Sequence, residues 1–365
     1  MIRVLHVVSG DLWAGAEVMV YNLLMNLQKQ SQFEIYTFLL NEGRLSRELR
    51  KSGFRVCIIE ENKHSFQYIG YKLSKMIRNA KPHVVHSHRY KENVLSFLAT
   101  RFLKGTKLVT TQHGLPEIFS GAKKQRFVTR LNYAILKMAF DKVVCVSNEI
   151  KGRFIDWDRF DPGLLAVVHN GISLNPPKND AKMGSGDFCI GSAGRLFPVK
   201  DYKLFIEIAR GVMKINNNVR FLLAGEGPEM SSLEMLVGKY GLGDRFEFLG
   251  HLDNMSDLYN RLDLYLNTSI HEGVPMSVLE AMAHGIPVVA PAVGGLREII
   301  EHGQNGYLID SRASEDFTHV CLDIMGDEHL YQRLSAAARQ RVSDFFTADQ
   351  MAKNYCKLYR ELIAN

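Results

Sequence analysis

The sequence predicts an α/β protein with two doubly wound domains in tandem, each a parallel sheet with helices on both faces. Three observations support this fold class. Short runs rich in β-branched residues alternate with amphipathic stretches along most of the 365 residues. The alternation stops once, at residues 170–187, and then starts again. A chain of this length is also long for one hydrophobic core and suits two.

The first domain, expected over residues 1–170, holds seven predicted strands. They are RVLHVV at 3–8, FEIYTFLL at 33–40, FRVCII at 54–59, HVVHSH at 83–88, KLVTT at 107–111, KVVCVS at 142–147 and LLAVVH at 164–169. Amphipathic stretches separate most of these runs. Because parallel strands need such crossover connections, the pattern favours a parallel sheet.

An interdomain linker is predicted at 170–187, "NGISLNPPKNDAKMGSGD", because it is rich in Asn, Pro, Gly and Ser and has no periodicity. The second domain is expected over residues 171–345. Its predicted strands are FCIGSA at 188–193, VRFLLAG at 219–225, RFEFLG at 245–250, LDLYLN at 262–267, IPVVAP at 286–291 and GYLI at 306–309. Beyond 311 the chain is predicted to be helical, and residues 346–365 form the last helix, with apolar residues three or four apart.

Composition excludes several classes of protein. The five cysteines have no CxxC spacing, which argues against a zinc site or a disulfide framework and fits a reducing compartment. The opening "MIRVLHVVSG" has one arginine and a short apolar run, so it predicts a buried strand and not a signal peptide. No run of about 18 apolar residues occurs, so we expect a cytoplasmic protein without a membrane span.

Charge is divided unevenly along the chain. Residues 1–170 carry 26 Lys and Arg against 14 Asp and Glu, whereas the remaining 195 residues carry 19 against 25. Residues 123–142 are the densest basic segment and contain Phe127, Leu131 and Ile135, which could contact an anionic lipid surface. The alternative is a solvated helix whose apolar side packs on its own domain. No basic motif interleaved with aromatic residues supports nucleic acid as a partner.

Ligands of doubly wound sheets bind beyond the carboxyl ends of the strands, so the turns there are the first places to search. After the first predicted strand, "SGDLWAGAE" places Gly10 and Gly15 before a helix, whose start favours an anion. Ordinary turn geometry would explain the two glycines equally well. The spacing is not GxGxxG, so the fingerprint of a dinucleotide-dependent dehydrogenase is absent.

Two further turns carry residues suited to binding. In "GRLFPVKD", Arg195 and Lys200 are two cations beside a helix start, which suits a pyrophosphate. The alternative is a pair of surface cations. In "TTQHGLPE", His113 follows a predicted strand, and its ring can donate to a developing negative charge or contact a sugar hydroxyl. A purely structural histidine is the alternative at this position.

The segment "HEGVPMSVLEAM", residues 271–282, contains two glutamates in a turn from strand to helix. Glu280 has a structural explanation, because Ser277 and Glu280 fit the capping box S-x-x-E. Glu272 has none, since it precedes a glycine in a loop after a predicted strand. The backbone N–H groups of residues 273–278, apart from Pro275, which has none, are expected to face outward at the helix start. Carboxylates accept hydrogen bonds from vicinal hydroxyls, so the segment suits a nucleotide sugar.

The segment "HEGVPMSVLEAMAHGIPVVAPAVGGLREII" resembles the signature of the family 4 retaining glycosyltransferases, which carry a Glu-x7-Glu motif. The similarity extends in order to "SGDLWAGAE", "VVHNGIS", "AGRLFPVKD", "LAGEGPE" and "FLGHLDN". The resemblance implies the GT-B fold: two facing Rossmann-like domains with parallel sheets and an interdomain cleft. It also implies that the first domain binds the acceptor and the second the nucleotide-sugar donor. The last helix would then cross back to the first domain.

The resemblance also implies roles for individual residues. Arg195 and Lys200 would hold the diphosphate, Glu280 the ribose hydroxyls, and Glu272 the donor sugar, and Glu272 and His113 are the two expected catalytic residues. The remaining expected donor contacts are Gly273, Val274, Pro275, Met276 and Ser277. Gly15 matches the glycine loop near the diphosphate and acceptor. The family often has two adjacent glycines there, whereas this chain has Ala14 and Gly15, so a methyl group stands where the backbone would approach the ligand.

The reaction implied is transfer of a sugar from a nucleotide-diphosphate sugar to an acceptor hydroxyl with retention of anomeric configuration. UDP is the favoured nucleotide and GDP the next, and no cofactor or essential metal is expected. The implied acceptors belong to bacterial surface polysaccharide, lipopolysaccharide or glycolipid synthesis, with peripheral binding at the inner face of the membrane. Two alternatives stay open: a GT-B nucleotide-sugar 2-epimerase and a non-catalytic nucleotide-sugar binding protein.

Overall fold

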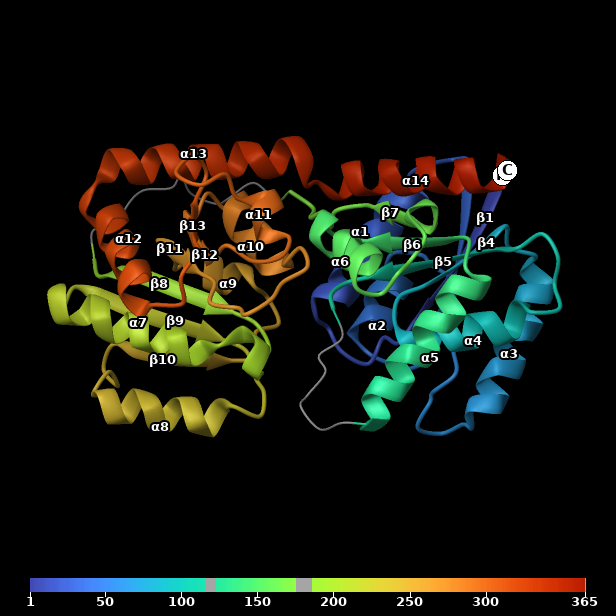
Figure 1. Ribbon diagram of the computed structural model, residues 1–365, viewed down its shortest axis with the longest axis horizontal. Coiled ribbons are helices and arrows are strands. Elements are labelled where there is room, and N and C mark those ends of the chain that lie inside the picture. The colour runs from blue at the N-terminus through green and yellow to red at the C-terminus, as the bar shows by residue number, and fades with distance from the viewer. Residues whose placement is uncertain (116–122, 175–185, 365) are drawn as a thin grey trace. The chain divides into compact units, whose positions relative to one another are not determined.

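The computed structural model describes residues 1–115, 123–174 and 186–364 (Figure 1). The chain divides into two compact units, residues 1–173 with 348–365, and residues 174–347. Each unit is a parallel sheet wound by helices. Every run predicted as a strand contains a strand of the structure, so the predicted α/β fold class is confirmed. The predicted linker at 170–187 lies largely outside the described residues.

The first unit contains a seven-stranded sheet in the order β3-β2-β1-β4-β5-β6-β7, and all its neighbours are parallel. Its strands are β1 (Ile2–Val8), β2 (Phe33–Leu39), β3 (Val56–Ile58), β4 (Val84–Ser87), β5 (Lys107–Gln112), β6 (Lys142–Cys145) and β7 (Leu165–Val167). The strand order reverses between β1 and β4. In a doubly wound sheet this switch point is where ligands bind.

In the described part of the first unit, six helices connect these strands, with a 3₁₀ turn at Pro162–Leu164 before β7. The helices are α1 (Gly15–Gln28), α2 (Arg44–Lys51), α3 (Phe66–Ala80), α4 (Tyr90–Thr100), α5 (Lys123–Ala139) and α6 (Asn148–Asp156). Helices α3, α4 and α5 pack in series, and α1 packs against α2. Within α5, Phe127 and Leu131 are exposed but Ile135 is buried in the core. The expectation that Ile135 contacts lipid is therefore wrong, because this side chain packs into the core of its own domain.

The last helix, α14 (Ala348–Ala364), belongs to the first unit although it follows the second in sequence. It lies against α1 (Figure 1). The N–H of Ala348 donates to the carbonyl of Ile172 across 2.8 Å, and the phenol of Tyr355 lies 2.7 Å from Oγ1 of Thr111. Tyr359 is also fully buried. The helix therefore completes the core of the first unit.

The second unit contains a six-stranded parallel sheet in the order β10-β9-β8-β11-β12-β13. Its strands are β8 (Phe188–Ala193), β9 (Val219–Ala224), β10 (Phe246–Gly250), β11 (Leu264–Leu266), β12 (Val288–Pro291) and β13 (Tyr307–Ile309). In chain order these strands are numbered 3-2-1-4-5-6 across the sheet, the Rossmann order, and the switch point lies between β8 and β11.

The helices of the second unit follow the same alternation, with a 3₁₀ turn at Pro198–Lys200. They are α7 (Tyr202–Ile215), α8 (Met230–Tyr240), α9 (Ser256–Tyr259), α10 (Met276–Ala283), α11 (Leu296–Ile299), α12 (Ser314–Gly326) and α13 (Glu328–Phe345). Phe205, Phe221 and Phe246 meet in its core, with ring centroids 5.7–6.3 Å apart. Among the described residues, no helix of either unit is long and apolar enough to cross a bilayer.

Candidate active site

Lys200 and Glu272 lie on the two sides of the switch point of the second sheet. Lys200 ends the 3₁₀ turn that follows β8, and Glu272 lies in the loop that follows β11. The Nζ atom of Lys200 is 2.6 Å from Oε1 of Glu272. The two loops that the sequence singled out separately are therefore joined by an ion pair at the edge where doubly wound sheets bind ligands.

Two neutral side chains hold the carboxylate of Glu272 in addition to Lys200. Its side chain is 8% exposed, and Oε1 also accepts from Ser269 Oγ at 2.6 Å and from Asn267 Nδ2 at 3.4 Å. Ser269 and Asn267 follow β11 directly, and neither was singled out from the sequence. All three of these bonds use Oε1 and none uses Oε2. The carboxylate is thus fixed through one oxygen.

The surroundings of Glu272 keep it ionised. Burial by itself raises the pKa of a carboxyl group, but the charge of Lys200 and the hydrogen bonds from Lys200, Ser269 and Asn267 outweigh it here. The pKa of Glu272 lies below its ordinary value as a result. A buried carboxylate that stays charged is available to accept hydrogen bonds from a ligand.

Backbone contacts hold the loop after β8 against the loop after β11. Thr268 Oγ1 donates to the carbonyl of Lys200 at 3.0 Å, and the N–H of Ile270 donates to the carbonyl of Val199 at 2.8 Å. Arg312 also joins the two loops, because it donates to the carbonyl of Thr268 and to the carboxylate of Asp201. These bonds position Lys200 and Glu272 independently of their own ion pair.

Glu280 does not cap the helix, so the capping-box alternative is wrong. Helix α10 begins at Met276 with Pro275 as its N-cap, and it has no side-chain cap. Ser277 is therefore inside the first turn. Instead, Oε2 of Glu280 accepts a hydrogen bond of 2.8 Å from the phenol of Tyr259, a residue of α9 that the sequence did not indicate. The S-x-x-E spacing matched a capping box because many helix starts contain a serine or threonine three residues before a glutamate.

The environment of Glu280 is the opposite of that of Glu272. Burial raises the pKa of Glu280 to about 7, and the hydrogen bond from Tyr259 lowers it only in part. The causes of this pKa shift include no cation that would stabilise the charged form of Glu280. The two glutamates of the motif are therefore a fixed carboxylate and a group that ionises near neutral pH.

The segment between the two glutamates turns the chain into α10. Gly273, Val274, Pro275 and Met276 are buried, and Ser277 is partly exposed. Pro275 is extended, with φ −70° and ψ 123°, so the first turn of α10 starts directly after it. The N–H groups of a first helical turn have no partner within the helix.

A pair of glycines supports this segment from the neighbouring strand. Gly294 and Gly295 follow β12, and a Cβ built on them would lie 1.8 Å from the carbonyl oxygen of Glu272 and 1.9 Å from that of Gly273. Gly294 has a φ of +56°. The sequence analysis missed this pair, although "AVGGL" follows a predicted strand and a glycine pair at that place is a detectable signal.

The remaining predicted residue of the second unit is exposed. The guanidinium of Arg195 lies over the ring of Phe197, with its central carbon 4.8 Å from the ring centroid. It follows β8 at the same edge of the sheet as Lys200. The N–H groups of a guanidinium lie in one plane, and such a group can present them to a phosphate.

His113 and Gly15 belong to the first unit. Gly15 is exposed and begins α1, after an extended Ala14. His113 follows β5, and its Nε2 lies 3.3 Å from Nδ1 of His88. Burial lowers the pKa of His113 to about 3, so its ring is neutral at physiological pH. Both residues lie at the carboxyl edge of the first sheet.

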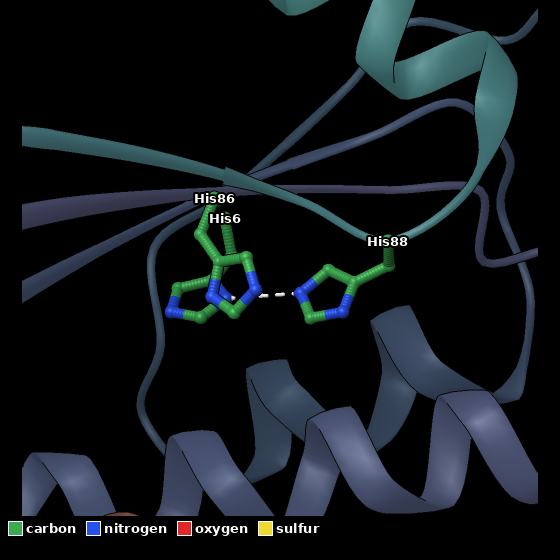
Figure 2. Close-up of side chains that lie close together, drawn as sticks. All are labelled: His6, His86 and His88. Atoms are coloured by element: carbon green, nitrogen blue, oxygen red, sulfur yellow. Dashed lines mark hydrogen bonds between the residues drawn. The ribbon is translucent and has the colours of Figure 1, made fainter. Parts of the chain in front are cut away.

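Three side chains of the described part of the chain lie close enough together to be considered as metal ligands: His6, His86 and His88 (Figure 2). Their geometry does not suit an ion. The rings of His86 and His88 are stacked, with centroids 4.4 Å apart, whereas a metal needs in-plane lone pairs that converge. Both nitrogens of His86 are also within hydrogen-bond distance of hydroxyls, those of Tyr359 and Thr111.

Family models match most of the chain. The model described as "Glycosyltransferase Family 4" matches residues 13–175, and "Glycosyl transferases group 1" matches residues 177–341. The chain belongs to the group 1, family 4 glycosyltransferases. The resemblance inferred from the Glu-x7-Glu segment is confirmed.

Relatives of this glycosyltransferase differ in what they are named for. It is 31% identical over 159 residues to the N-acetyl-alpha-D-glucosaminyl L-malate synthase of Bacillus anthracis. The aligned residues make up 43% of this chain and 42% of that relative. It therefore aligns with less than half the length of that protein. It is 24% identical over 307 residues to the UDP-Gal:alpha-D-GlcNAc-diphosphoundecaprenol alpha-1,3-galactosyltransferase of Escherichia coli, covering 80% of this chain and 79% of that relative.

Solved structures confirm the fold of this glycosyltransferase. Anabaena HepE in complex with UDP-glucose superimposes with a TM-score of 0.87 at 20% sequence identity, covering 99% of this chain and 100% of that chain. An identity this low establishes the fold alone. The predicted GT-B fold, in the sense of two parallel-sheet Rossmann-like units, is therefore confirmed.

Proposed function

We propose that this glycosyltransferase moves a sugar from a nucleotide-diphosphate sugar to an acceptor hydroxyl with retention of anomeric configuration. A UDP-sugar is the favoured donor and a GDP-sugar the next. The observation that carries the proposal is the Lys200–Glu272 pair at the switch point of the second sheet. A charged carboxylate and a cation side by side match a donor that carries both sugar hydroxyls and a diphosphate.

Each group at this edge has a part in the proposed reaction. Negative charge develops on the leaving diphosphate, and Arg195, Lys200 and the backbone N–H groups at the start of α10 stabilise it; these N–H groups belong to Gly273, Val274, Met276 and Ser277. Lys200 then bridges Glu272 and the phosphate. Glu272, fixed through Oε1, accepts from the donor sugar through Oε2, and Glu280 accepts from the ribose hydroxyls.

The acceptor hydroxyl is proposed to attack on the face from which the diphosphate leaves, and the departing phosphate takes its proton. No protein nucleophile and no essential metal are needed for that route. In the first unit, His113 contacts the donor sugar, and Gly15 lies in the loop near the diphosphate and acceptor. Both lie at the carboxyl edge of their sheet, and His113 is neutral there, so its ring offers either an N–H or a lone pair.

Relatives support the choice of donor and acceptor class. One relative is named for a UDP-galactose donor and a diphosphoundecaprenol-linked acceptor. The Anabaena HepE structure described above holds UDP-glucose. We therefore place the acceptor among the carbohydrates and lipid-linked sugars of bacterial surface polysaccharide, lipopolysaccharide or glycolipid synthesis. The cytoplasm is the proposed compartment, since the nucleotide sugars it needs are made there.

We also propose that the first unit binds an anionic membrane surface. Phe127, Leu131 and Met138 are exposed on the basic helix α5, and Phe102, which follows the neighbouring helix α4, is 82% exposed. Apolar side chains among basic ones are typical of a helix that lies in the lipid headgroup region. A lipid-linked acceptor would be reached from that surface.

Kinetics of two variants test the donor site. Glu280→Gln should raise the donor KM about tenfold with a small change in kcat, because it weakens a ribose contact made equally in ground and transition states. Glu272→Ala should lower kcat by about a hundredfold, because it removes a contact to the sugar being transferred and leaves Lys200 unpaired. Unchanged kinetics in both variants would refute the site.

The same assay separates the alternatives. A 2-epimerase would consume a nucleotide sugar without any acceptor and release an epimer of it. A binding protein would retain the donor and show neither transfer nor hydrolysis. A new glycosidic bond that forms only with an acceptor excludes both.

A further inference from the structure

Four histidines meet at the switch point of the first sheet, where β1 lies beside β4. His6 of β1 and His86 of β4 are partners in register, His88 follows β4, and His113 follows β5. His6, His86 and His88 are at most 3% exposed. Nothing in the proposed reaction uses His6, His86 or His88. Buried polar side chains usually have a structural or functional role, so the position of these imidazoles at a ligand-binding edge needs an explanation.

Three of these histidines form one continuous chain of hydrogen bonds. His6 Nδ1 lies 3.2 Å from His88 Nε2, the bond drawn as a dashed line in Figure 2. His88 Nδ1 lies 3.3 Å from His113 Nε2. His88 thus uses both of its nitrogens to join the other two rings, one on each side.

The two ends of the chain are buried and have no hydrogen-bond partner among the described residues: His6 Nε2 at one end and His113 Nδ1 at the other. The hydrogen-bonding capacity of His113 Nδ1 is therefore unused. His86 stacks on His88 but is outside the chain, because its nitrogens lie 2.6 Å from the phenol of Tyr359 and 2.8 Å from Oγ1 of Thr111.

Neutral imidazoles allow such a chain only two proton arrangements. Each neutral ring carries one N–H and one bare nitrogen. If His6 donates from Nδ1, His88 must accept at Nε2 and donate from Nδ1, and His113 then also carries its proton on Nδ1. If His113 donates from Nε2, all three rings carry their protons on Nε2. The three tautomers are therefore linked.

We propose that His6 and His88 are positioning residues whose tautomers are linked to that of His113, so that the three rings together set whether the free Nδ1 of His113 meets the donor sugar as a donor or as an acceptor. This inference rests on the proposed role of His113 as a contact of the donor sugar. His88 acts directly through its bond to His113. His6 acts through His88 and touches neither His113 nor the substrate.

The surroundings keep the chain neutral, as the linkage requires. Burial lowers the pKa of His6 and of His113 to about 3, and burial with the neighbouring imidazoles holds that of His88 well below its ordinary value. Arg89, adjacent to His88, contributes in the same direction at His113. A second proton on His88 would let it donate to both neighbours at once, and the tautomers of His6 and His113 would then no longer be linked.

The first test is made on the protein alone. With selectively ¹⁵N-labelled histidine, the ring nitrogen shifts of His6, His88 and His113 report each tautomer, and single substitutions assign them. The proposal predicts that all three rings carry the proton on the same kind of nitrogen. A mixed set, for example Nδ1–H in His88 and Nε2–H in His113, would overturn it.

Variants then test whether the chain acts as a unit. His6→Phe breaks the far end without touching His113, and we expect His113 to become a mixture of tautomers and kcat to fall about tenfold. His88→Phe should do the same or more. His88→Asn places an amide near the former Nδ1 but cannot reach His6, so it should lose kcat as His6→Phe does.

The matched control is Tyr359→Phe, which removes the phenol bonded to His86 and leaves the chain intact. It should lower the melting temperature but leave the tautomer of His113 and kcat unchanged. A tautomer of His113 that is the same in His6→Phe as in the wild type would contradict the proposal. If His113→Ala transfers sugar normally, the proposed function of His113 fails, while the tautomer measurement still decides whether the chain is linked.

Discussion

Glu272 and Glu280 are two carboxylates of one motif whose surroundings shift their pKa values in opposite directions. Lys200 and two neutral donors stabilise the charge of Glu272, whereas Glu280 meets a single phenol in a buried place. The first is poised to stay an anion at any physiological pH. The second is costly to ionise in the absence of a ligand.

That cost gives a prediction about stability and pH. The pKa of Glu280 is raised to about 7, so between about pH 4.5 and 7 the unfolded chain loses this proton while the folded protein keeps it. Stability therefore falls as pH rises through that window, by on the order of 3 kcal/mol. Glu280→Gln cannot ionise and keeps a hydrogen-bond acceptor for Tyr259.

Urea unfolding of both proteins at pH 5 and pH 8 measures this effect. The variant should equal the wild type at pH 5 and exceed it at pH 8, while its donor binding is weaker at both. A stability difference that does not change with pH would show that Glu280 ionises normally in the folded protein.

At the level of elements, the site is made by three loops that leave adjacent strands. The loop after β8 brings Lys200, the loop after β11 brings Glu272, and the loop after β12 brings Gly294 and Gly295 against the backbone of Glu272 and Gly273. Because β8, β11 and β12 are neighbours in the sheet, residues up to about a hundred positions apart meet at one edge.

Gly294→Ala tests this packing. The added Cβ would overlap the carbonyl of Glu272 at a φ of +56°, so the loop that holds Glu272 must move. We expect a loss of about 3 kcal/mol or more in the free energy of unfolding and a large fall in kcat. The control is Gly303→Ala, which has a φ of +74° but open space around its Cβ, and should cost about 1 kcal/mol and leave kcat unchanged.

The strands and the Glu272 loop could be predicted from sequence because they depend on local pattern. Period and residue type identify a strand, and a polar residue after it falls at the carboxyl edge. The partners could not be predicted in this way. Tyr259 reaches Glu280 from another helix, and only the fold brings them together. Likewise the local sequence fits a capping box, but in the fold the carboxylate of Glu280 binds Tyr259 instead of a backbone N–H group.

At the scale of the whole molecule, each Rossmann-like unit has its own candidate surface. The second unit carries the Glu-x7-Glu edge, and the first carries the basic helix α5 and the histidine chain. The charge difference between the halves of the sequence corresponds to this division. It was visible from composition, but the burial of Ile135 was not, since the periodicity of α5 does not say how much of its apolar side is covered.

Membrane binding is predicted for this basic surface. Pelleting with vesicles that contain about 30% anionic lipid should recover the protein, and vesicles of neutral lipid should not. Arg126→Gln with Arg130→Gln, two exposed charges of α5, should weaken pelleting about tenfold. The control pair is Lys203→Gln with Lys214→Gln, exposed charges of α7, and should change nothing. Equal recovery with neutral and anionic vesicles would contradict the proposal that the first unit binds an anionic membrane surface.

The central claim is that the edge containing Glu272 and Glu280 binds a nucleotide-diphosphate sugar. A thermal-shift series with UDP-, GDP-, ADP- and dTDP-sugars tests it most directly, because a ligand of the native state raises Tm according to its concentration over Kd. We predict stabilisation by one nucleotide class, UDP first, and its loss in Glu280→Gln. No shift with any of the four, or an equal shift in the variant, would contradict the assignment of this site.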